Sequence, residues 1–407
     1  MAGRLPGMNK SAVFQKTSLF GIFLFAVSLP ISFVPAEFGI ALAVAGWLCD
    51  GIFSRRWQFK WHPFFIPLLF YIGWNIISST FSPRPLHSLW ALADNEWALC
   101  MMLMMYWVIN DKETLMKVAY AFLMTSSLNM AYALLQTVTG VEFYRDMKLD
   151  WLNGAYRAVG FQGFYLTFAA FAMASFFLSS GLWLALKGRK RLWMAGLSVA
   201  SFFAVIVTFA RSIWLSFLIA LPAFGFHKSK RFGLTVTGGF AGIIALALTL
   251  SPMIRHRAAS IFDLQQNETR LNLWKTSVNI FKEYPLTGVG EDNFDYYFER
   301  YKVEGFYDTT VHPHNDYLNV LVSSGFPGLI AFLSLWVLTI KEGFRASKQA
   351  SGDRIRALAL GSMLTILGFL IGGFFQNYYG TFANCLEWWF MTGLVFTSAK
   401  LGEQKSS

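Results

Sequence analysis

The chain has 407 residues, of which 55% are hydrophobic and only 14% charged. A soluble chain carries about 25% charged residues, so this one has too few charges to cover its apolar side chains. The composition excludes a soluble globular protein, a disordered chain and a disulfide scaffold, and it predicts an all-α integral membrane protein with many spans.

The net charge of +11 would suit a nucleic-acid partner if the protein were soluble. In a membrane protein, however, Lys and Arg concentrate in cytoplasmic loops. Topology therefore accounts for the charge, and we expect no nucleic-acid partner. The cysteines, Cys49, Cys100 and Cys385, fall in apolar stretches, so we expect free thiols and no disulfide framework.

Apolar runs long enough to cross a bilayer begin near the N-terminus. The first nine runs cover about residues 17–34, 38–53, 63–80, 88–109 and 115–138, a run ending at Lys187, two runs that meet at residues 210–212, and residues 232–251. Three more follow at about 326–340, 357–376 and 384–399. The sequence thus predicts about twelve transmembrane helices.

A long polar segment, about residues 252–325, separates the ninth run from the tenth. If the N-terminus is cytoplasmic, most of the 34 Lys and Arg residues fall on the cytoplasmic side, as the positive-inside rule requires. This places the polar segment on the outer face of the membrane and both termini in the cytoplasm. We expect spans in residues 1–251, an outer helical loop in 252–325, and spans again in 326–407.

The outer loop begins with a helical pattern. Asn267 is a suitable N-cap, and Leu271, Trp274, Val278 and Phe281 form one apolar stripe, so we expect a helix that packs on the spans or lies along the membrane. The aromatic cluster Phe294, Tyr296, Tyr297, Phe298 and Tyr301 follows. These rings would suit an interfacial aromatic belt or a platform on which sugars stack.

Two histidines, His312 and His314, precede a short helix that Gly325-Phe326-Pro327-Gly328 interrupts. A helix N-terminus disfavours imidazolium and favours a nearby anion, so His314 is placed to act as a neutral base. Two other interpretations stay open. The histidines could bind a metal with Asp316 as third ligand, or they could be structural capping residues. A serine hydrolase is not indicated, because no Gly-x-Ser-x-Gly motif is present.

Four arginines are expected on the outer side: Arg84, Arg157, Arg211 and Arg270. An ionisable group at membrane depth is costly and usually faces a cavity, and the planar guanidinium group donates hydrogen bonds in pairs to phosphate oxygens. We therefore expect Arg211 and Arg270 to bind a phosphorylated substrate. Arg157, His312 and Arg84 are further candidates for substrate contact, although each could form a structural ion pair.

The segment 285–290, Pro-Leu-Thr-Gly-Val-Gly, followed by His314-Asn315, nine residues and Gly325-x-x-Gly328, resembles the O-antigen ligase family. The resemblance covers the whole chain in layout, and its motifs are specific from about residue 270 to 328. It implies a metal-independent glycosyltransferase in the bacterial inner membrane. Such an enzyme transfers a glycan from undecaprenyl diphosphate to a sugar hydroxyl of lipid A-core at the periplasmic face, with no cofactor.

On this hypothesis His314 is the general base of an inverting transfer, and Arg211 and Arg270 stabilise the departing diphosphate. Three alternatives differ in substrate or in class. An O-antigen polymerase would extend one lipid-linked glycan with another, and a protein O-oligosaccharyltransferase would use a Ser or Thr hydroxyl. A transporter of lipid-linked glycan would be indicated by the in-span acids Asp50, Asp94 and Glu96, but the chain has no repeated half.

Overall fold

The computed structural model describes residues 10–55, 57–152, 155–261, 263–265, 267–307 and 312–403. These residues are almost wholly helical, with one hairpin of two-residue strands, β1 (Val141–Glu142) and β2 (Met147–Lys148). The expected all-α membrane fold is confirmed. The three cysteines are free thiols, as their apolar surroundings predicted.

The helices before the polar segment are, in chain order, α1 (Lys10–Ser28), α2 (Phe33–Ser54), α3 (Phe65–Thr80), α4 (Pro85–Glu96), α5 (Leu99–Val108), α6 (Lys112–Thr139), the 3-10 turn η1 (Gly160–Gln162), α7 (Tyr165–Ala185), α8 (Gly188–Thr208), α9 (Arg211–Lys228) and α10 (Lys230–Leu250). The rest of the chain forms α11 (Pro252–Ala259), α12 (Glu268–Glu283), α13 (Phe294–Tyr301), α14 (Asp316–Gln349), α15 (Asp353–Gly372) and α16 (Phe382–Glu403).

Among the described residues, eight helices are long and apolar enough to cross a bilayer: α1, α2, α6, α7, α8, α10, α14 and α15. Helices α3 and α5 are apolar but shorter. The expected run 88–109 is divided between α4 and α5, next to the buried acid Glu96. A multispan membrane protein is therefore confirmed, and the number twelve stays a prediction.

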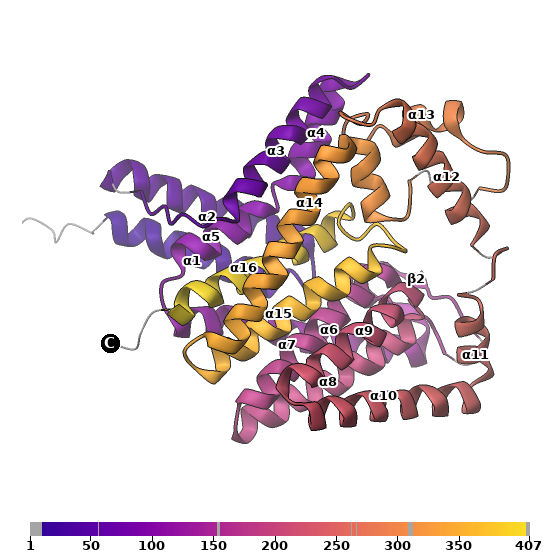
Figure 1. Cartoon of the computed structure of the whole chain (residues 1–407). Coiled ribbons are helices and arrows are strands. Elements are labelled where there is room, and N and C mark those ends of the chain that lie inside the picture. The colour runs from indigo at the N-terminus through magenta and orange to yellow at the C-terminus, as the bar shows by residue number, and fades with distance from the viewer. Residues whose placement is uncertain are drawn as a thin grey trace, which may run out of the picture.

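Small residues allow the spanning helices to approach one another closely. A Cβ on Gly21 of α1 would lie 2.4 Å from the backbone nitrogen of Ala43, and one on Gly361 of α15 would lie 2.7 Å from the carbonyl oxygen of Phe177. Such packing drives helix association in lipid, where apolar side chains gain nothing by leaving the solvent. Helices α7, α15 and α16 form the buried centre, whereas α10 lies at the edge with only 6% of its span buried (Figure 1).

Basic residues connect the helix ends on one side of the bundle. Lys348 Nζ donates to the carbonyl oxygen of His227 over 2.5 Å, Lys60 Nζ donates to Asn110 Oδ1 over 2.6 Å, and Lys400 Nζ donates to the carbonyl oxygen of Ile109 over 2.6 Å. All of these residues lie in or next to segments expected in the cytoplasm. The contacts therefore bring together, across the bundle, segments that the charge pattern assigned to one side.

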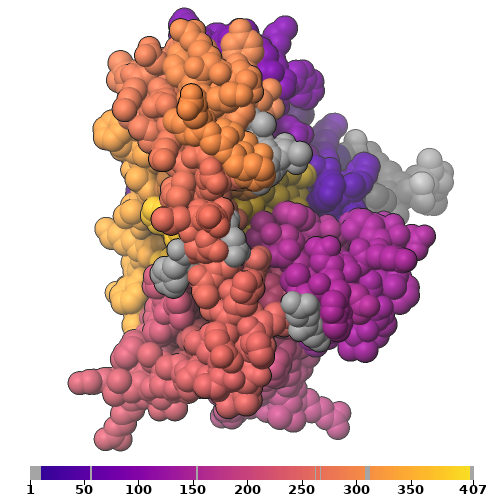
Figure 2. All heavy atoms as spheres, turned by 90° about the vertical axis from the view of Figure 1, so that its right-hand side faces the viewer, coloured from indigo at the N-terminus to yellow at the C-terminus, as the bar shows by residue number. Residues whose placement is uncertain are grey.

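The segment from α11 to α13 lies at the opposite side, beyond the ends of α4 and α9 (Figure 1). Figure 2 shows the right-hand side of Figure 1 turned toward the viewer. There the segment runs down the middle of the molecule, beside the loop around residues 140–160. Helix α14 starts on this side and is interrupted at Gly325, where φ is 66° and ψ is −169°. The break expected at Gly325-x-x-Gly328 is confirmed, and it separates the short helix that follows His314 from a long apolar helix.

The apolar stripe on the helix after Asn267 is present but is not the most buried face, since Val278 is 39% exposed. Helix α12 instead buries Asn272, Leu273, Thr276, Ser277 and Ile280. Its buried polar groups have partners, because Asn272 Nδ2 donates to the carbonyl oxygen of Phe306 and the Thr276 hydroxyl donates to the Asn272 carbonyl oxygen. Short polar residues that are buried with hydrogen-bond partners do not add to an apolar pattern, so the sequence does not indicate this face.

Candidate active site

His314 lies immediately before the N-cap of α14 and has a left-handed backbone, with φ at 48°. This conformation is uncommon for a residue with a Cβ and requires support from neighbouring contacts. The Asn315 side chain caps α14 by accepting from Leu318 N over 2.9 Å. The indole of Trp274 on α12 donates to the carbonyl oxygen of Pro313 over 3.0 Å. The two contacts hold the imidazole where α12 meets α14, and the expected position of His314 before a helix is confirmed.

A hydrogen bond to Gln376 defines the tautomer of His314. Gln376 Oε1 lies 3.2 Å from His314 Nδ1, and an amide oxygen can only accept, so Nδ1 carries the proton. The basic lone pair of the neutral ring then lies on Nε2. His312 has the complementary arrangement, because its Nδ1 accepts from the backbone N–H of His314 over 3.3 Å. The two rings lie 4.0 Å apart between centroids.

The turn 373–381 between α15 and α16 supports this arrangement. The Asp316 carboxylate accepts from the backbone N–H groups of Tyr378 and Tyr379, over 3.2 and 2.9 Å. The Tyr379 hydroxyl donates to the buried Glu96 over 2.8 Å. Asp316 therefore binds the turn. Among the described residues, no group of three or more His, Cys, Asp and Glu side chains could hold a metal ion.

A cavity of about 320 Å³ lies beside this turn and contains Arg211 and Arg270. Arg211, the first residue of α9, donates from Nη1 to the carbonyl oxygen of Ser260 over 2.5 Å and from Nη2 to Asn267 Oδ1 over 3.3 Å. Asn267 occupies the expected N-cap position of α12, but its side chain binds Arg211 and backbone carbonyl oxygens and does not cap the helix. The contacts fix both the cavity wall and the direction of the Arg211 guanidinium group.

Four arginines gather around this cavity. Arg257, Arg270 and Arg157 all lie close enough to Arg211 to repel its charge. Arg157 donates from Nε to the carbonyl oxygen of Thr208 over 3.0 Å. Burial and the neighbouring Arg257 lower the pKa of Arg157. Such a concentration of positive charge is unfavourable unless an anion balances it, so the cluster is suited to a phosphorylated ligand.

The arginine cavity adjoins an apolar groove of about 180 Å³ between α8, α9, α10 and α11. The two share Leu215 and Ile261 as lining residues. The groove is lined by the apolar side chains of residues such as Phe240, Ile243 and Leu218. A cationic compartment and an apolar compartment thus adjoin, as a lipid with a phosphate headgroup would require.

The arginine cavity also borders the histidine segment. Trp274, which lines the cavity, donates to the carbonyl oxygen of Pro313. Phe375, another lining residue, is followed by Gln376, the partner of His314. On the other side of the turn, Ser212 next to Arg211 is hydrogen bonded to the Tyr378 hydroxyl over 2.8 Å. Trp274 and Phe375 thus connect the wall that contains Arg211 and Arg270 with the segment that carries His314.

A second cavity, of about 230 Å³, lies on the side of His312 and is acidic. Its lining includes Glu291, Asp292 and Asp295, together with amide and hydroxyl groups such as that of Asn319. Burial, with a smaller contribution from Asp292, raises the pKa of Glu291 to about 7. A hydroxyl-rich ligand could hydrogen bond to these groups, whereas a phosphate would be repelled.

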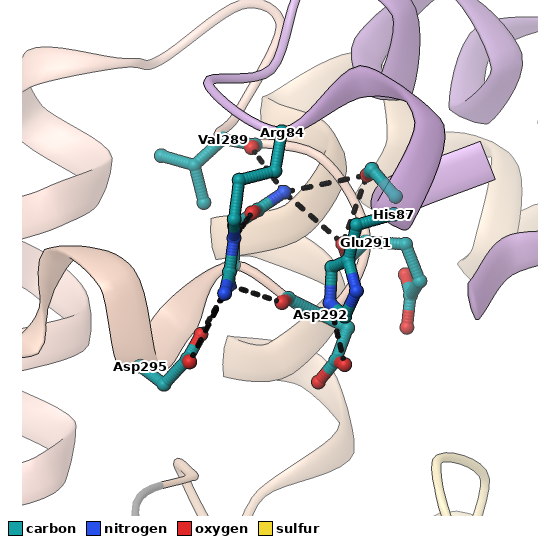
Figure 3. A network of polar contacts seen from close by, with 8 residues as sticks. Arg84, His87, Val289, Glu291, Asp292 and Asp295 are labelled. Atoms are coloured by element: carbon teal, nitrogen blue, oxygen red, sulfur yellow. Dashed lines mark hydrogen bonds and ion pairs between the residues drawn. The ribbon is translucent and has the colours of Figure 1, made fainter. Parts of the chain in front are cut away.

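Arg84, the remaining expected substrate contact, belongs to a different network (Figure 3). It donates to Asn293 Oδ1 over 2.9 Å, to the carbonyl oxygen of Asp292 over 2.9 Å, and to Asp295 Oδ1 over 2.5 Å. His87 pairs with the Asp292 carboxylate over 3.0 Å. These contacts connect α4 to the turn before α13, and the structure does not bring Arg84 into the arginine cavity.

The aromatic cluster of α13 is divided between two environments. Phe294 and Phe298 are buried in a small core with Leu273 and Ile280 of α12, so these two rings stabilise the outer segment. Tyr296 is 57% exposed and lies under Arg84, 5.5 Å from its guanidinium carbon. The aromatic belt and the sugar platform therefore stay predictions for the tyrosines alone.

The sequence analysis missed Arg257, Gln376 and Tyr378. Arg257 is one of three basic residues in α11 and did not differ in pattern from its neighbours. Residues 376–381, Gln-Asn-Tyr-Tyr-Gly-Thr, were read only as the boundary between two spans. The signal that could have identified them is a polar turn on the same side as the histidines.

The two motifs that carried the family resemblance contact each other. The Phe326 N–H donates to the carbonyl oxygen of Pro285 over 2.9 Å, and the Val289 N–H donates to that of Val322 over 2.9 Å. A Cβ on Gly325 would lie 2.1 Å from the carbonyl oxygen of Leu286. The turn 285–290 thus fits into the kink of α14, and glycine is required there because the two backbones touch.

Residues 196–333 match the model of a family described as O-antigen ligase. No curated protein matches the chain. A solved structure described as "Structural coordination of polymerization and crosslinking by a peptidoglycan synthase complex" contains a chain that is similar over 84% of this chain and 98% of its own, with 14% identity and a TM-score of 0.46. The family match contains His312, His314, Arg211 and Arg270. It confirms the resemblance read from the sequence and relates this chain, through residues 196–333, to the O-antigen ligase superfamily.

Proposed function

We propose that this protein is a membrane glycosyltransferase of the O-antigen ligase type. It transfers a glycan from undecaprenyl diphosphate to a sugar hydroxyl of lipid A-core, as a step in lipopolysaccharide synthesis. One observation carries the proposal: the arginine cavity adjoins an apolar groove on one side and the segment that carries His314 on the other. A polyprenyl diphosphate needs the arginine cavity for its phosphates and the apolar groove for its chain. An acceptor hydroxyl needs His314 as a base.

The donor occupies the arginine cavity and the apolar groove. Its diphosphate lies against Arg211 and Arg270, with Arg157 and Arg257 adding to the positive potential. Its isoprenoid chain lies in the groove beside α10, which is the least buried of the eight candidate spans among the described residues. Preorganised guanidinium groups stabilise the negative charge that develops on the leaving diphosphate. No metal ion is required for that role.

In the reaction, His314 Nε2 takes the proton of the acceptor hydroxyl. The acceptor oxygen forms a bond to the anomeric carbon from the face opposite the diphosphate. The bond from that carbon to the diphosphate oxygen breaks, and its electron pair stays on undecaprenyl diphosphate. The anomeric configuration is inverted. Gln376, by accepting from Nδ1, keeps the lone pair directed from Nε2.

The acceptor sugar lies in the acidic cavity beside His312, where carboxylate and amide oxygens accept hydrogen bonds from sugar hydroxyls. The donor compartment is then lined by guanidinium groups and the acceptor compartment by carboxyl and amide groups, with the histidine segment beside both. The proposal places the site on the periplasmic face of the inner membrane with both termini in the cytoplasm, in accord with the positive-inside rule. The hydrogen bonds that Lys348, Lys60 and Lys400 donate to His227, Asn110 and Ile109 at the other helix ends support this orientation.

The direct test is ligation in vitro by the purified protein, with a glycan on undecaprenyl diphosphate as donor and lipid A-core as acceptor. We expect His314→Ala to lower the rate by about 10²–10⁴-fold, the usual contribution of a positioned general base. His227→Ala, at the opposite helix ends, is the control and should ligate at the wild-type rate. Near-normal ligation by the His314 variant would remove it as the base, and loss of activity in excess chelator restored by a divalent ion would contradict the arginine mechanism.

The acceptor distinguishes the ligase from its alternatives. The same donor is incubated with lipid A-core, with a second molecule of lipid-linked glycan, or with a Ser- and Thr-containing protein. We expect product only with lipid A-core. Deletion of the gene should correspondingly leave bare lipid A-core and long polymer on undecaprenyl diphosphate. Core that carries a single repeat unit would indicate a polymerase, and donor retained on the inner leaflet would indicate a transporter.

A further inference from the structure

A cavity of about 710 Å³ lies away from the candidate active site, where the first turns of α6, α8 and α15 meet. Its charged lining residues are Lys112, Lys117, Lys190 and Arg354, with the acids Glu113 and Asp353. The turn 373–381 lies at the other end of α15, which has 20 residues and is therefore about 30 Å long. The cavity and the proposed glycosyltransferase site are thus on opposite ends of the spanning helices.

The cavity has an excess of positive charge. Both acids are already paired with basic side chains: Glu113 with Lys117 over 2.7 Å, and Asp353 with Arg356, which does not line the cavity. Lys112, Lys190 and Arg354 are therefore in excess over the acids. Lys190 Nζ lies 5.2 Å from the ring centroid of Tyr120, which holds its ammonium group over the cavity wall.

The helix ends add to this potential. Helix α8 begins after Lys187 and α15 begins after Gly352, and neither has a side-chain cap. The first N–H groups of such helices have no partner within the helix, and the helix dipole gives this end a partial positive charge. Anions bind at helix N-termini for these reasons. Two uncapped N-termini and the basic side chains thus point to one anionic ligand.

The surroundings indicate an anion with an apolar body. Met116, Ala185 and Ile355 line the same cavity as the basic groups. Helices α6, α7, α8 and α15 are all long and apolar enough to cross a bilayer, so the cavity lies at the level where a bilayer presents its headgroups. Leu192, two residues after Lys190, is 73% exposed and continues the apolar surface toward the bilayer. Basic pockets between spans on the cytoplasmic side are suited to anionic phospholipid headgroups.

We propose that this cavity binds the phosphate headgroup of an anionic phospholipid of the inner leaflet. The bound lipid neutralises the excess charge and connects the ends of α6, α8 and α15. This site is independent of the glycosyltransferase proposal, because its occupancy can be measured without any donor or acceptor of glycan.

The test is native mass spectrometry of the full-length protein released from bilayers that contain equal amounts of phosphatidylglycerol and phosphatidylcholine. We expect wild type to retain phosphatidylglycerol preferentially. Arg354→Gln and Lys190→Gln should each lower that retention about fivefold, since one basic residue near an anionic membrane contributes about that factor to binding. Two single variants are used so that failure of one to fold leaves the other informative.

Arg189→Gln and Arg191→Gln are the matched controls. Each removes one positive charge from the first turn of α8, beside the test residue Lys190, but neither residue lines the cavity. Equal loss of lipid from controls and test variants, or equal retention of the two lipids by wild type, would overturn the proposal. In a further arm inorganic phosphate is added to the protein that retains phosphatidylglycerol. Phosphate binding that displaces the lipid and is lost in Arg354→Gln would assign the cavity to a soluble phosphate and also overturn it.

Discussion

The hydrogen bond between His314 and Gln376 is the contact at the residue scale on which the proposed chemistry depends most. Gln376→Leu removes the acceptor at Nδ1 but leaves the imidazole in place. We expect kcat to fall about fivefold, the usual effect of one neutral hydrogen bond, with little change in KM. Gln376→Glu keeps an acceptor and adds a negative charge. Because a neighbouring carboxylate favours the protonated imidazole, the acid limb of the pH–rate profile should move to higher pH in this variant.

A merely structural role for Gln376 would lower activity in both variants without moving the acid limb. Gln349→Glu introduces the same charge at the inner end of α14, where the side chain is exposed, and serves as the control for net charge. An unchanged acid limb in Gln376→Glu would show that the His314 ring does not titrate beside residue 376 during the reaction.

The sequence could identify the arginines, because a charged residue is rare in apolar surroundings. Arg157, Arg211 and Arg270 were selected because arginine in an apolar context is costly, and the structure groups all three. Arg84 was selected by the same criterion, but its guanidinium binds Asp295 and Asn293. The partners lie more than 200 residues away in the chain, so no local pattern could distinguish a paired arginine from one that faces a cavity.

At the scale of elements, the kink of α14 is the feature that positions the histidine segment. Gly325 adopts positive φ, and a Cβ there would lie 2.1 Å from the carbonyl oxygen of Leu286. Gly325→Ala therefore combines an unfavourable backbone conformation, which costs about 1 kcal/mol or more, with a backbone clash. We expect a lower thermal unfolding temperature in detergent and a large loss of ligation, because the short helix after His314 would shift.

Gly239→Ala on α10 is the matched control, because a Cβ at that helical position meets no atom within 4 Å. This variant should be neutral or slightly stabilising, since alanine restricts the unfolded chain more than glycine. If Gly325→Ala unfolds at the wild-type temperature and ligates normally, the fit between the turn 285–290 and α14 has no role in holding the site.

Helix boundaries were more predictable than helix faces. The end of the helix after Asn267 and the break at Gly325 follow from Pro285 and from glycine, which act locally. The most buried face of α12 did not follow from its apolar stripe, because Thr276 and Ser277 are buried against tertiary partners. Which face of a short amphipathic helix is buried depends on what lies opposite, and that information is not contained in the helix itself.

At the scale of the whole molecule, apolar runs and charge bias predicted the fold class because the bilayer imposes both on every span. The number of spans was less predictable. α3 and α5 are short, and α4 ends at a buried acid that accepts from Tyr71 and Tyr379. The adjoining arginine cavity and apolar groove could not be predicted, since they combine residues of α8, α9, α10, α11 and α12.

The groove between α9 and α10 gives the last prediction. Leu218 lines the groove, whereas the next residue, Ile219, does not line it and is 55% exposed. Leu218→Trp should narrow the groove and raise KM for a donor with a full-length undecaprenyl chain, because part of the apolar contact is lost. KM for a donor with the same glycan and a chain of only two isoprene units should change little, since its diphosphate still reaches Arg211. Ile219→Trp adds the same bulk outside the groove and should leave both KM values unchanged. Equal effects of Leu218→Trp on the two donors would mean that the isoprenoid chain lies elsewhere. The position of the groove beside the arginine cavity would then not support the proposed function.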